Sequence, residues 1–147
     1  MPFLVKNRAN VPDSANPIVI IATQDFELTF ESKGDYLQVE VIGTHDSFRI
    51  SLDYWTLIAK ECLERNAQRL LVIERLGLHL GDRDMPKLVA EVAAMGINHI
   101  RIAFIELMID DMPEMEYGEI LAREKGMTGR VFSNVEDAKR WLRHGVD

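Results

Sequence analysis

The sequence contains a single cysteine, Cys62, among its 147 residues. A lone cysteine excludes an internal disulfide and any zinc site built from several cysteines, and it is typical of a reducing compartment. Long apolar runs are missing too, because the longest fall far short of the ~20 residues that a membrane-spanning helix needs. The first six residues lack the continuous apolar segment of a signal peptide. We therefore expect a cytoplasmic protein that does not insert into a membrane.

Basic residues are outnumbered by acidic ones. The 17 Lys and Arg residues face 24 Asp and Glu residues, which gives a formal net charge of -7. Nucleic-acid phosphates and anionic lipids both attract positive surfaces, so we expect neither partner. No phosphate loop, dinucleotide fingerprint, nucleophile elbow or zinc-ligand spacing occurs. We expect no cofactor and no metal, and these absences favour a non-enzymatic protein without excluding an enzyme.

The chain has the length of one domain. Residues 1–17 carry Asn, Pro, Asp and Ser with few apolar residues from position 7 onward, and they predict an irregular N-terminal arm. Residues 18–147 predict a single α/β domain. It begins with a short β-branched run at 18–22. Residues 26–43 then alternate between apolar and polar on both sides of a Lys-Gly-Asp turn, which predicts an antiparallel hairpin.

Helical spacing replaces the alternation after residue 50. One apolar face predicts a helix that begins behind Ser51 as N-cap and carries Leu52, Trp55, Ile58, Ala59, Cys62 and Leu63. The apolar runs 70–73 and 100–105 predict strands that are covered on both faces. Further helices are expected at about 85–95, 113–125 and 135–144, with a last short strand at 129–132. The order ββαβαβαβα predicts a mixed sheet with helices packed on it, and an extra strand in front is an open possibility.

The last part of the chain has a distinctive spacing. Phe132 is followed by a capping-box pattern at 133–136, then by Ala138 and the pair Trp141-Leu142. With the hairpin and the runs 70–74 and 101–104, this tail resembles the SpoIIAA-like branch of the STAS fold (sulfate transporter and anti-sigma-factor antagonist) over about residues 18–145. The resemblance implies a SpoIIAA-like mixed sheet and a regulatory role through partner binding.

The best-known members of that family are switches that a kinase phosphorylates on a Ser or Thr after the second buried strand. The matching segment here, residues 74–84, contains neither Ser nor Thr. The phosphorylation switch therefore does not carry over, and the chain resembles relatives without that residue.

Two loops, 75–84 and 106–115, follow strands that should be parallel, so both should lie at the same edge of the sheet. They are unusually apolar and contain Leu76, Leu78, Leu80, Leu107, Met108, Ile109 and Met112. Such an edge could bind a protein partner or a second copy of the chain. It could instead bind a small apolar or lipid-like ligand, or simply cover the core. We expect a partner-binding role first and a carrier role second.

His79 lies in the first of these loops, with Asp82 and Asp84 close in sequence and Asp110 in the second loop. If these groups converged, the imidazole and a carboxylate could act together in an enzyme. The plainer interpretation is an exposed histidine beside a helix cap. We include His79 with the apolar residues as a candidate binding residue and assign no catalytic residue.

Two further candidates have plainer explanations. The acidic segment 110–116 could hold a divalent cation. It lacks EF-hand spacing, and it fits the start of a helix with Asp111 as cap and Pro113 in the first turn. Cys62, Trp55 and Trp141 lie on apolar helix faces, and we expect all three in the core.

Overall fold

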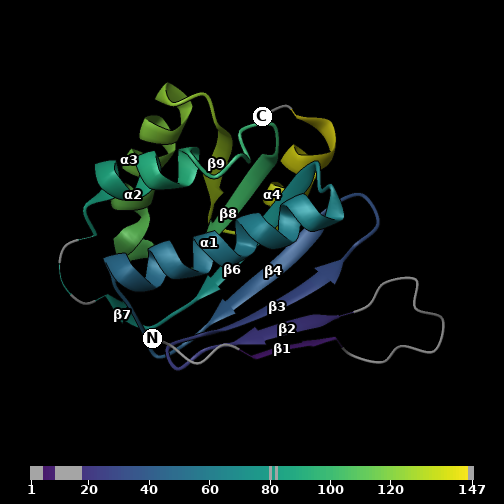
Figure 1. The fold of residues 1–147 in the computed structure, drawn as a ribbon. Helices are drawn as coiled ribbons and strands as arrows, with labels where there is room; N and C mark the ends of the chain where they lie inside the picture. Colours follow the sequence, from purple (N-terminus) through teal and green to yellow (C-terminus); the bar gives the residue numbers. More distant parts are fainter. Residues whose placement is uncertain (1–4, 9–17, 80, 82, 146–147) are drawn as a thin grey trace.

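The computed structural model describes residues 5–8, 18–79, 81 and 83–145, and it has an α/β fold (Figure 1). The described strands form a seven-stranded mixed sheet in the order β1-β2-β3-β4-β6-β8-β9. These strands span Val5–Arg8, Val19–Ala22, Glu27–Ser32, Leu37–Ile42, Arg69–Arg75, Arg101–Glu106 and Thr128–Phe132. The first four pair antiparallel, whereas β4, β6, β8 and β9 are mutually parallel neighbours. The predicted hairpin and the mixed α/β sheet are confirmed.

The N-terminal arm is only partly as expected. Val5–Arg8 form β1 and pair antiparallel with β2, so these four residues are an edge strand and not irregular chain. The run Val-Lys-Asn-Arg shows no clear alternation, and its pairing with the apolar β2 supplies the order that its sequence does not reveal. The rest of the predicted arm lies outside the described residues.

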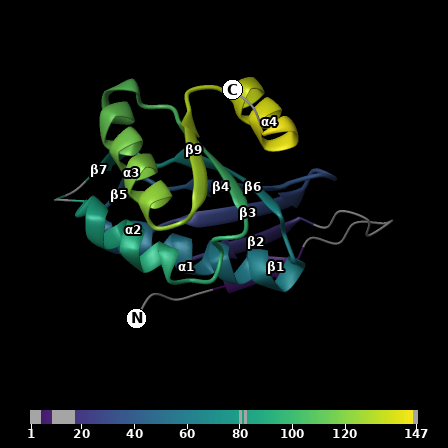
Figure 2. The same ribbon diagram turned by 90° about the horizontal axis from the view of Figure 1, so that it is seen from above.

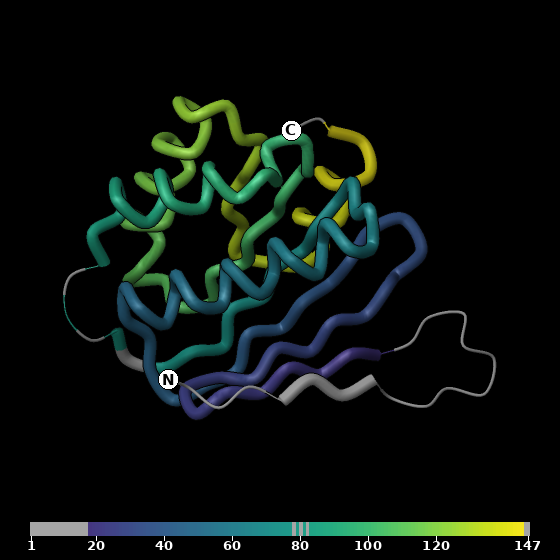
Figure 3. Tube along the Cα trace, in the orientation of Figure 1, coloured from purple at the N-terminus to yellow at the C-terminus, as the bar shows by residue number. Residues whose placement is uncertain are grey.

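Helices connect the parallel strands. They span Phe48–Arg65 (α1), Met85–Ala93 (α2), Met112–Glu124 (α3) and Val135–His144 (α4). Figure 2 shows α1 and α2 on one side of the sheet and α4 on the other. In the tube of Figure 3, α1 and α2 run side by side, and α3 packs against α2 and β9. The space between α1, α2, α3 and the sheet is therefore enclosed by three helices.

Two predicted helix starts are displaced. Ser47 caps α1, because its hydroxyl accepts a hydrogen bond from the Ile50 amide, so the expected cap Ser51 lies inside the helix and is buried. Asn134 caps α4 through the Asp137 amide, one residue after the predicted Ser133. In both places a second polar residue competes for the cap, and only three-dimensional packing decides between them.

Alternate residues of the central strands enter two apolar clusters. In β6, Leu70 and Val72 face the helices α1, α2 and α3, whereas Leu71 and Ile73 face α4. Cys62 is fully buried in the first cluster, and burial raises the pKa of its thiol to about 12. Trp141 is buried in the second cluster, while Trp55 is partly buried against the first. The expected core positions of these three residues are confirmed.

A small parallel pair lies beside the main sheet. His45–Asp46 (β5) pair with Leu78–His79 (β7), so that Asp46 and His79 are register partners. The chain after β6 passes very close to the chain after β4. A Cβ at Gly77 would collide with the Thr44 carbonyl oxygen, and a Cβ at Gly43 would lie 2.8 Å from the Asp25 carbonyl oxygen. Glycine at position 77 therefore allows the segments after β4 and β6 to lie side by side, and glycine at position 43 allows the segment after β4 to pass close to the turn between β2 and β3.

Candidate functional site: an apolar pocket with a buried acidic end

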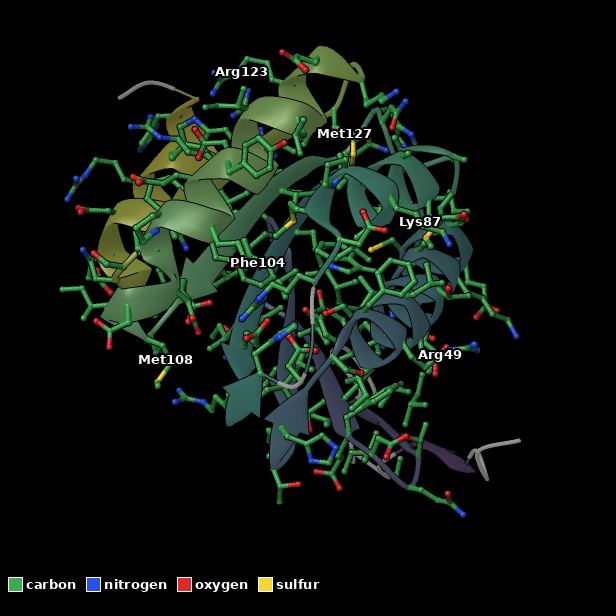
Figure 4. The ribbon with its side chains drawn as sticks, turned by 90° about the vertical axis from the view of Figure 1, so that its left-hand side faces the viewer. Arg49, Lys87, Phe104, Met108, Arg123 and Met127 are labelled. Carbon is green, nitrogen blue, oxygen red and sulfur yellow. The ribbon has the colours of Figure 1, made fainter. Side chains whose placement is uncertain are left out.

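A pocket of about 120 Å³ lies between α1, α2, α3 and the strands β8 and β9. Its wall is mainly apolar and includes Leu88, Val92, Ile102, Phe104, Met115 and Ala122. Figure 4 shows this side of the molecule, with Phe104 in the interior between α2 and α3. The inner faces of α2 and α3 each supply four of the lining residues, and α1, β8 and β9 supply most of the others. A dry apolar cavity of roughly 150 Å³ is known to take up benzene, so this pocket suits a ligand of about that size or slightly smaller.

Polar side chains gather at the part of the pocket next to the carboxyl end of β6. Ser51 and Tyr54 come from α1, Glu74 comes from β6, and Arg83 comes from the segment before α2. The Tyr54 hydroxyl donates a hydrogen bond of 3.0 Å to Oε2 of Glu74. Within the described part of the chain, no other hydrogen bond reaches the Glu74 carboxyl. The pocket therefore combines an apolar body with a polar end, as ligand sites generally do.

Glu74 is the most perturbed carboxyl group of this end. Burial, together with the nearby carboxylates Asp46 and Glu106, raises its pKa to about 8. The hydrogen bond from Tyr54 and the charge of Arg83 act in the opposite direction. Glu74 is consequently protonated at neutral pH. Burial and the charge of Glu74 also raise the pKa of Tyr54.

Asp46 is buried beside this group. Its Oδ1 accepts hydrogen bonds from the Ser47 amide (2.7 Å) and the Ser51 hydroxyl (2.9 Å). Its Oδ2 is buried and accepts no hydrogen bond from any described residue, and it lies 3.6 Å from Nη1 of Arg83. The displaced helix start explains the presence of Ser51 here, since a cap residue would not face the core.

Arg83 is a buried cation shared by several acids. Its Nε lies 2.7 Å from Glu114, and its Nη2 lies 3.4 Å from Asp111. Asp111 precedes α3, as predicted, but its carboxylate makes no capping hydrogen bond and instead pairs with Arg83. The acidic segment 110–116 therefore helps to hold the guanidinium at the pocket. Among the described residues no group of three or more His, Cys, Asp or Glu side chains is placed to hold a metal ion.

Glu106 completes the acidic end. It is the register partner of Glu74 on the neighbouring strand, and both side chains point to the face of α1, α2 and α3. Its Oε1 accepts a hydrogen bond of 2.8 Å from the Met108 amide, whereas its buried Oε2 has no hydrogen-bond partner in the described chain. Burial raises the pKa of Glu106, and the charge of Asp111 adds to the rise. Two adjacent parallel strands thus end in buried carboxyl groups.

The residues of the predicted apolar edge divide into two sets. Leu76 is buried in the core against Gly43, so it covers the sheet end and does not form a surface. Leu107, Met108 and Ile109 are 48%, 52% and 83% exposed, and Met108 projects outward in Figure 4. Met112 is partly buried. The Leu78 side chain and Leu80 lie outside what the structure describes.

The His79 ring makes no hydrogen bond to Asp84 or Asp110, two of the carboxylates proposed to act with it. Its Nδ1 donates to the Gly81 carbonyl oxygen at 3.0 Å, and its Nε2 is buried without a partner among the described residues. Asp84 caps α2 by accepting a hydrogen bond from the Lys87 amide, and Asp110 is exposed. Asp82 lies outside the described residues. The acidic residue next to His79 in the fold is its register partner Asp46. Asp46 lies 33 residues earlier in the sequence, so sequence proximity does not reveal the pair.

Sequence patterns contained one usable signal for the pocket that the sequence analysis missed. The strands β6 and β8 both contain Ile-Glu near their carboxyl ends, at Ile73-Glu74 and Ile105-Glu106. Parallel strands with the same ending place the two carboxyl groups side by side. No local pattern identified Asp46, Tyr54 or Arg83, because the pairing of β5 with β7 and the packing of α1 and α2 bring them together.

None of the described helices is both long and apolar enough to cross a membrane. Comparison of the chain with models of protein families, with curated proteins and with solved structures found no match. The function of the chain therefore has to be inferred from the pocket and from its surface.

Proposed function

We propose that this chain binds a small, mainly apolar ligand in the pocket between α1, α2 and α3. The observation that supports the proposal is the cavity of about 120 Å³ with a mainly apolar wall and a polar end. The pocket is partly open to the surface, so its apolar wall contacts water when it is empty. A mainly apolar ligand would remove this wall from water, which is favourable. The proposed ligand site is thus the pocket between the helices and the sheet, and not the apolar loops at the edge of the sheet.

A larger side chain in the pocket wall should occupy the space of the ligand and weaken its binding. Ala122→Leu adds three carbon atoms at the pocket wall on α3. We expect benzene or 1-butanol to shift the backbone amide NMR signals of pocket residues such as Leu88 and Val92 in the wild-type protein. The affinity should fall at least tenfold in Ala122→Leu. The exposed Ile120→Leu on the same helix is the matched control and should bind as the wild type does.

Two results would contradict this proposal. One is that neither probe shifts pocket signals at concentrations up to its solubility. The other is that both variants bind equally well, because the probe would then occupy a different part of the molecule.

A partner-binding module of SpoIIAA-like fold is the second candidate. The mixed sheet, in which a hairpin is followed by three strand-helix crossovers and a helix on the opposite face, supports this fold type. The exposed residues Leu107, Met108 and Ile109 support a surface for a protein partner or for self-association. Both statements are proposals from the resemblance and from exposure.

Self-association through this loop predicts a charge-sensitive dimer. Ile109→Glu places a carboxylate at the most exposed of the three residues. We expect sedimentation velocity to show a concentration-dependent dimer for the wild type and a monomer for Ile109→Glu, because burying an unpaired charge is unfavourable. The control Ile120→Glu changes another exposed isoleucine away from the loop. A wild-type protein that stays monomeric at all concentrations would exclude self-association through this loop.

A further inference from the structure

Acidic residues outnumber basic ones around the polar end of the pocket: Glu74 and Arg83 line it, and Asp46, Glu106, Asp111 and Glu114 lie next to them. Arg83 pairs directly with Asp46, Asp111 and Glu114, and its charge also acts on Glu74 and Glu106. One guanidinium thus forms ion pairs with three carboxylates and acts electrostatically on two further carboxyl groups. The other charged residues of the pocket wall, Glu119 and Arg130, come from α3 and β9, and Glu119 pairs with Arg123. An anionic ligand would be repelled from the acidic end, whereas a cationic ligand would reduce its charge imbalance.

Two buried carboxylate oxygens next to this end have no hydrogen-bond donor among the described residues. Oδ2 of Asp46 and Oε2 of Glu106 are buried and accept no hydrogen bond from the described residues. Glu74 receives one hydrogen bond, from the Tyr54 hydroxyl. The donors present are largely used, because Ser51 donates to Asp46 and Tyr54 donates to Glu74. An ammonium group supplies three donors and no acceptor, so it can bind the Glu74 carboxylate and the hydroxyl oxygens of Tyr54 and Ser51, which line the pocket, as a carboxylate ligand cannot.

Aromatic rings line the pocket beside this end. Tyr54, Trp55 and Phe104 are all part of the wall, and the Trp55 and Phe104 rings are stacked with centroids 6.2 Å apart. Aromatic faces attract ammonium groups, more strongly when water is excluded. Aliphatic side chains of α2, such as Leu88, Val89 and Val92, also belong to the wall and suit a hydrocarbon chain.

We propose that the pocket selects small amines, with the ammonium group at Glu74 and Tyr54 and the hydrocarbon part between α2 and α3. This inference rests on the proposed function and specifies the class of ligand. The pocket volume limits the ligand to on the order of six non-hydrogen atoms, the size of benzene. Alkylamines of four or five carbons fit this limit.

Binding of an amine requires Glu74 to lose its proton. Asp46, Glu106 and burial hold the proton on Glu74 in the empty pocket, against the opposing effects of Tyr54 and Arg83. The ammonium replaces this proton as the compensating positive charge. The pKa of about 8 implies that amine affinity rises by roughly tenfold between pH 6 and pH 7, since an alkylammonium keeps its charge throughout this range.

Three probes of equal length test the inference: butylamine, 1-butanol and butyrate, titrated against the full chain by amide NMR at pH 6, 7 and 8. We expect butylamine to bind at least tenfold more tightly than 1-butanol at pH 8, and butyrate not to bind. Glu74→Gln should remove both the amine preference and the pH dependence, while 1-butanol affinity stays within about threefold. Tyr54→Phe keeps the carboxyl group and should retain the amine preference.

The outcomes separate this inference from the proposed function. If 1-butanol shifts the pocket signals and butylamine binds no better, with no pH dependence, amine selection is overturned and apolar-ligand binding stands. Tighter binding of butyrate would overturn amine selection as well. If none of the three shifts the pocket signals, both proposals fail. Because the comparison of the three probes and the pH series are made on the wild type, a poorly folded Glu74→Gln would not prevent a decision.

Discussion

Replacement of Arg83 by alanine is expected to lower the free energy of unfolding by about 3–5 kcal/mol, the cost of removing one partner from a buried charged group. The Arg83 side chain is 7% exposed and pairs with three carboxylates. Asp111 and Glu114 are partly exposed and can regain water in the variant. Asp46 is 1% exposed and cannot, so its negative charge would stay buried without a cation. Urea unfolding at pH 7, followed by circular dichroism, measures the difference.

Arg75→Ala is the matched control for this prediction. Arg75 also pairs with a carboxylate, that of Glu40 at 2.8 Å, but its side chain is 51% exposed. Exposed pairs of this kind contribute about 0–1 kcal/mol, because water and salt screen the charges. Equal losses in the two variants would show that the charges at the polar end of the pocket are well solvated, in contradiction to the burial described above.

Glu74→Gln is expected to change how stability depends on pH. The pKa of Glu74 in the folded protein is about 8, above that of an exposed glutamate. A folded-state pKa that is raised means that the native protein binds more protons than the unfolded chain, so stability is greatest below the unfolded pKa and is lost as pH rises through the folded value. Between pH 5 and pH 8 the wild type should lose up to about 1.4 kcal/mol per pH unit from this group, and Glu74→Gln should lack this loss. The stability of Glu74→Gln relative to the wild type should thus increase with pH.

The measurement is urea unfolding of both proteins at pH 5, 6.5 and 8. Glu40→Gln makes the same chemical change in a partly exposed ion pair, so any trend common to both variants does not come from burial at the pocket. A difference between wild type and Glu74→Gln that stays constant with pH would contradict the raised pKa. The hydrogen bond from Tyr54 can pass to the amide oxygen of Gln, which favours correct folding of the variant.

The main features of the fold were predictable because they depend on local patterns. The alternation at 26–43 and the apolar runs at 70–73 and 100–105 correspond to β3, β4, β6 and β8. The errors arise where local preferences are nearly balanced. Ser47 and Ser51 are both suitable caps, and only the burial of Ser51 against Asp46 decides between them. Val5–Arg8 has no alternation of its own and is ordered by pairing with β2.

The candidate site was predictable only in outline. The sequence analysis expected a ligand or partner at the carboxyl ends of the parallel strands, and the polar end of the pocket lies beside them. Its particular residues were not predicted, because they are separated in sequence. The pairing of β5 with β7 and the packing of α1 and α2 bring together Asp46, Tyr54, Glu74 and Arg83. Apolar residues in a loop also do not reveal whether they face water, as the buried Leu76 and the exposed Ile109 show.

The close backbone approaches at Gly43 and Gly77 have a consequence for identifying relatives of this chain. A side chain at position 77 would collide with the backbone of Thr44, and one at position 43 would collide with that of Asp25. Backbone atoms cannot move aside as the end of a flexible side chain can, so any homologue that keeps these two approaches must keep glycine at both positions. Evolution can replace the apolar wall residues by others of similar volume, but it has no such freedom here. The two glycines therefore form a signature for distant homologues whose overall similarity is too low to detect. The first glycine comes one residue after β4, and the second comes two residues after β6 and three residues after Glu74.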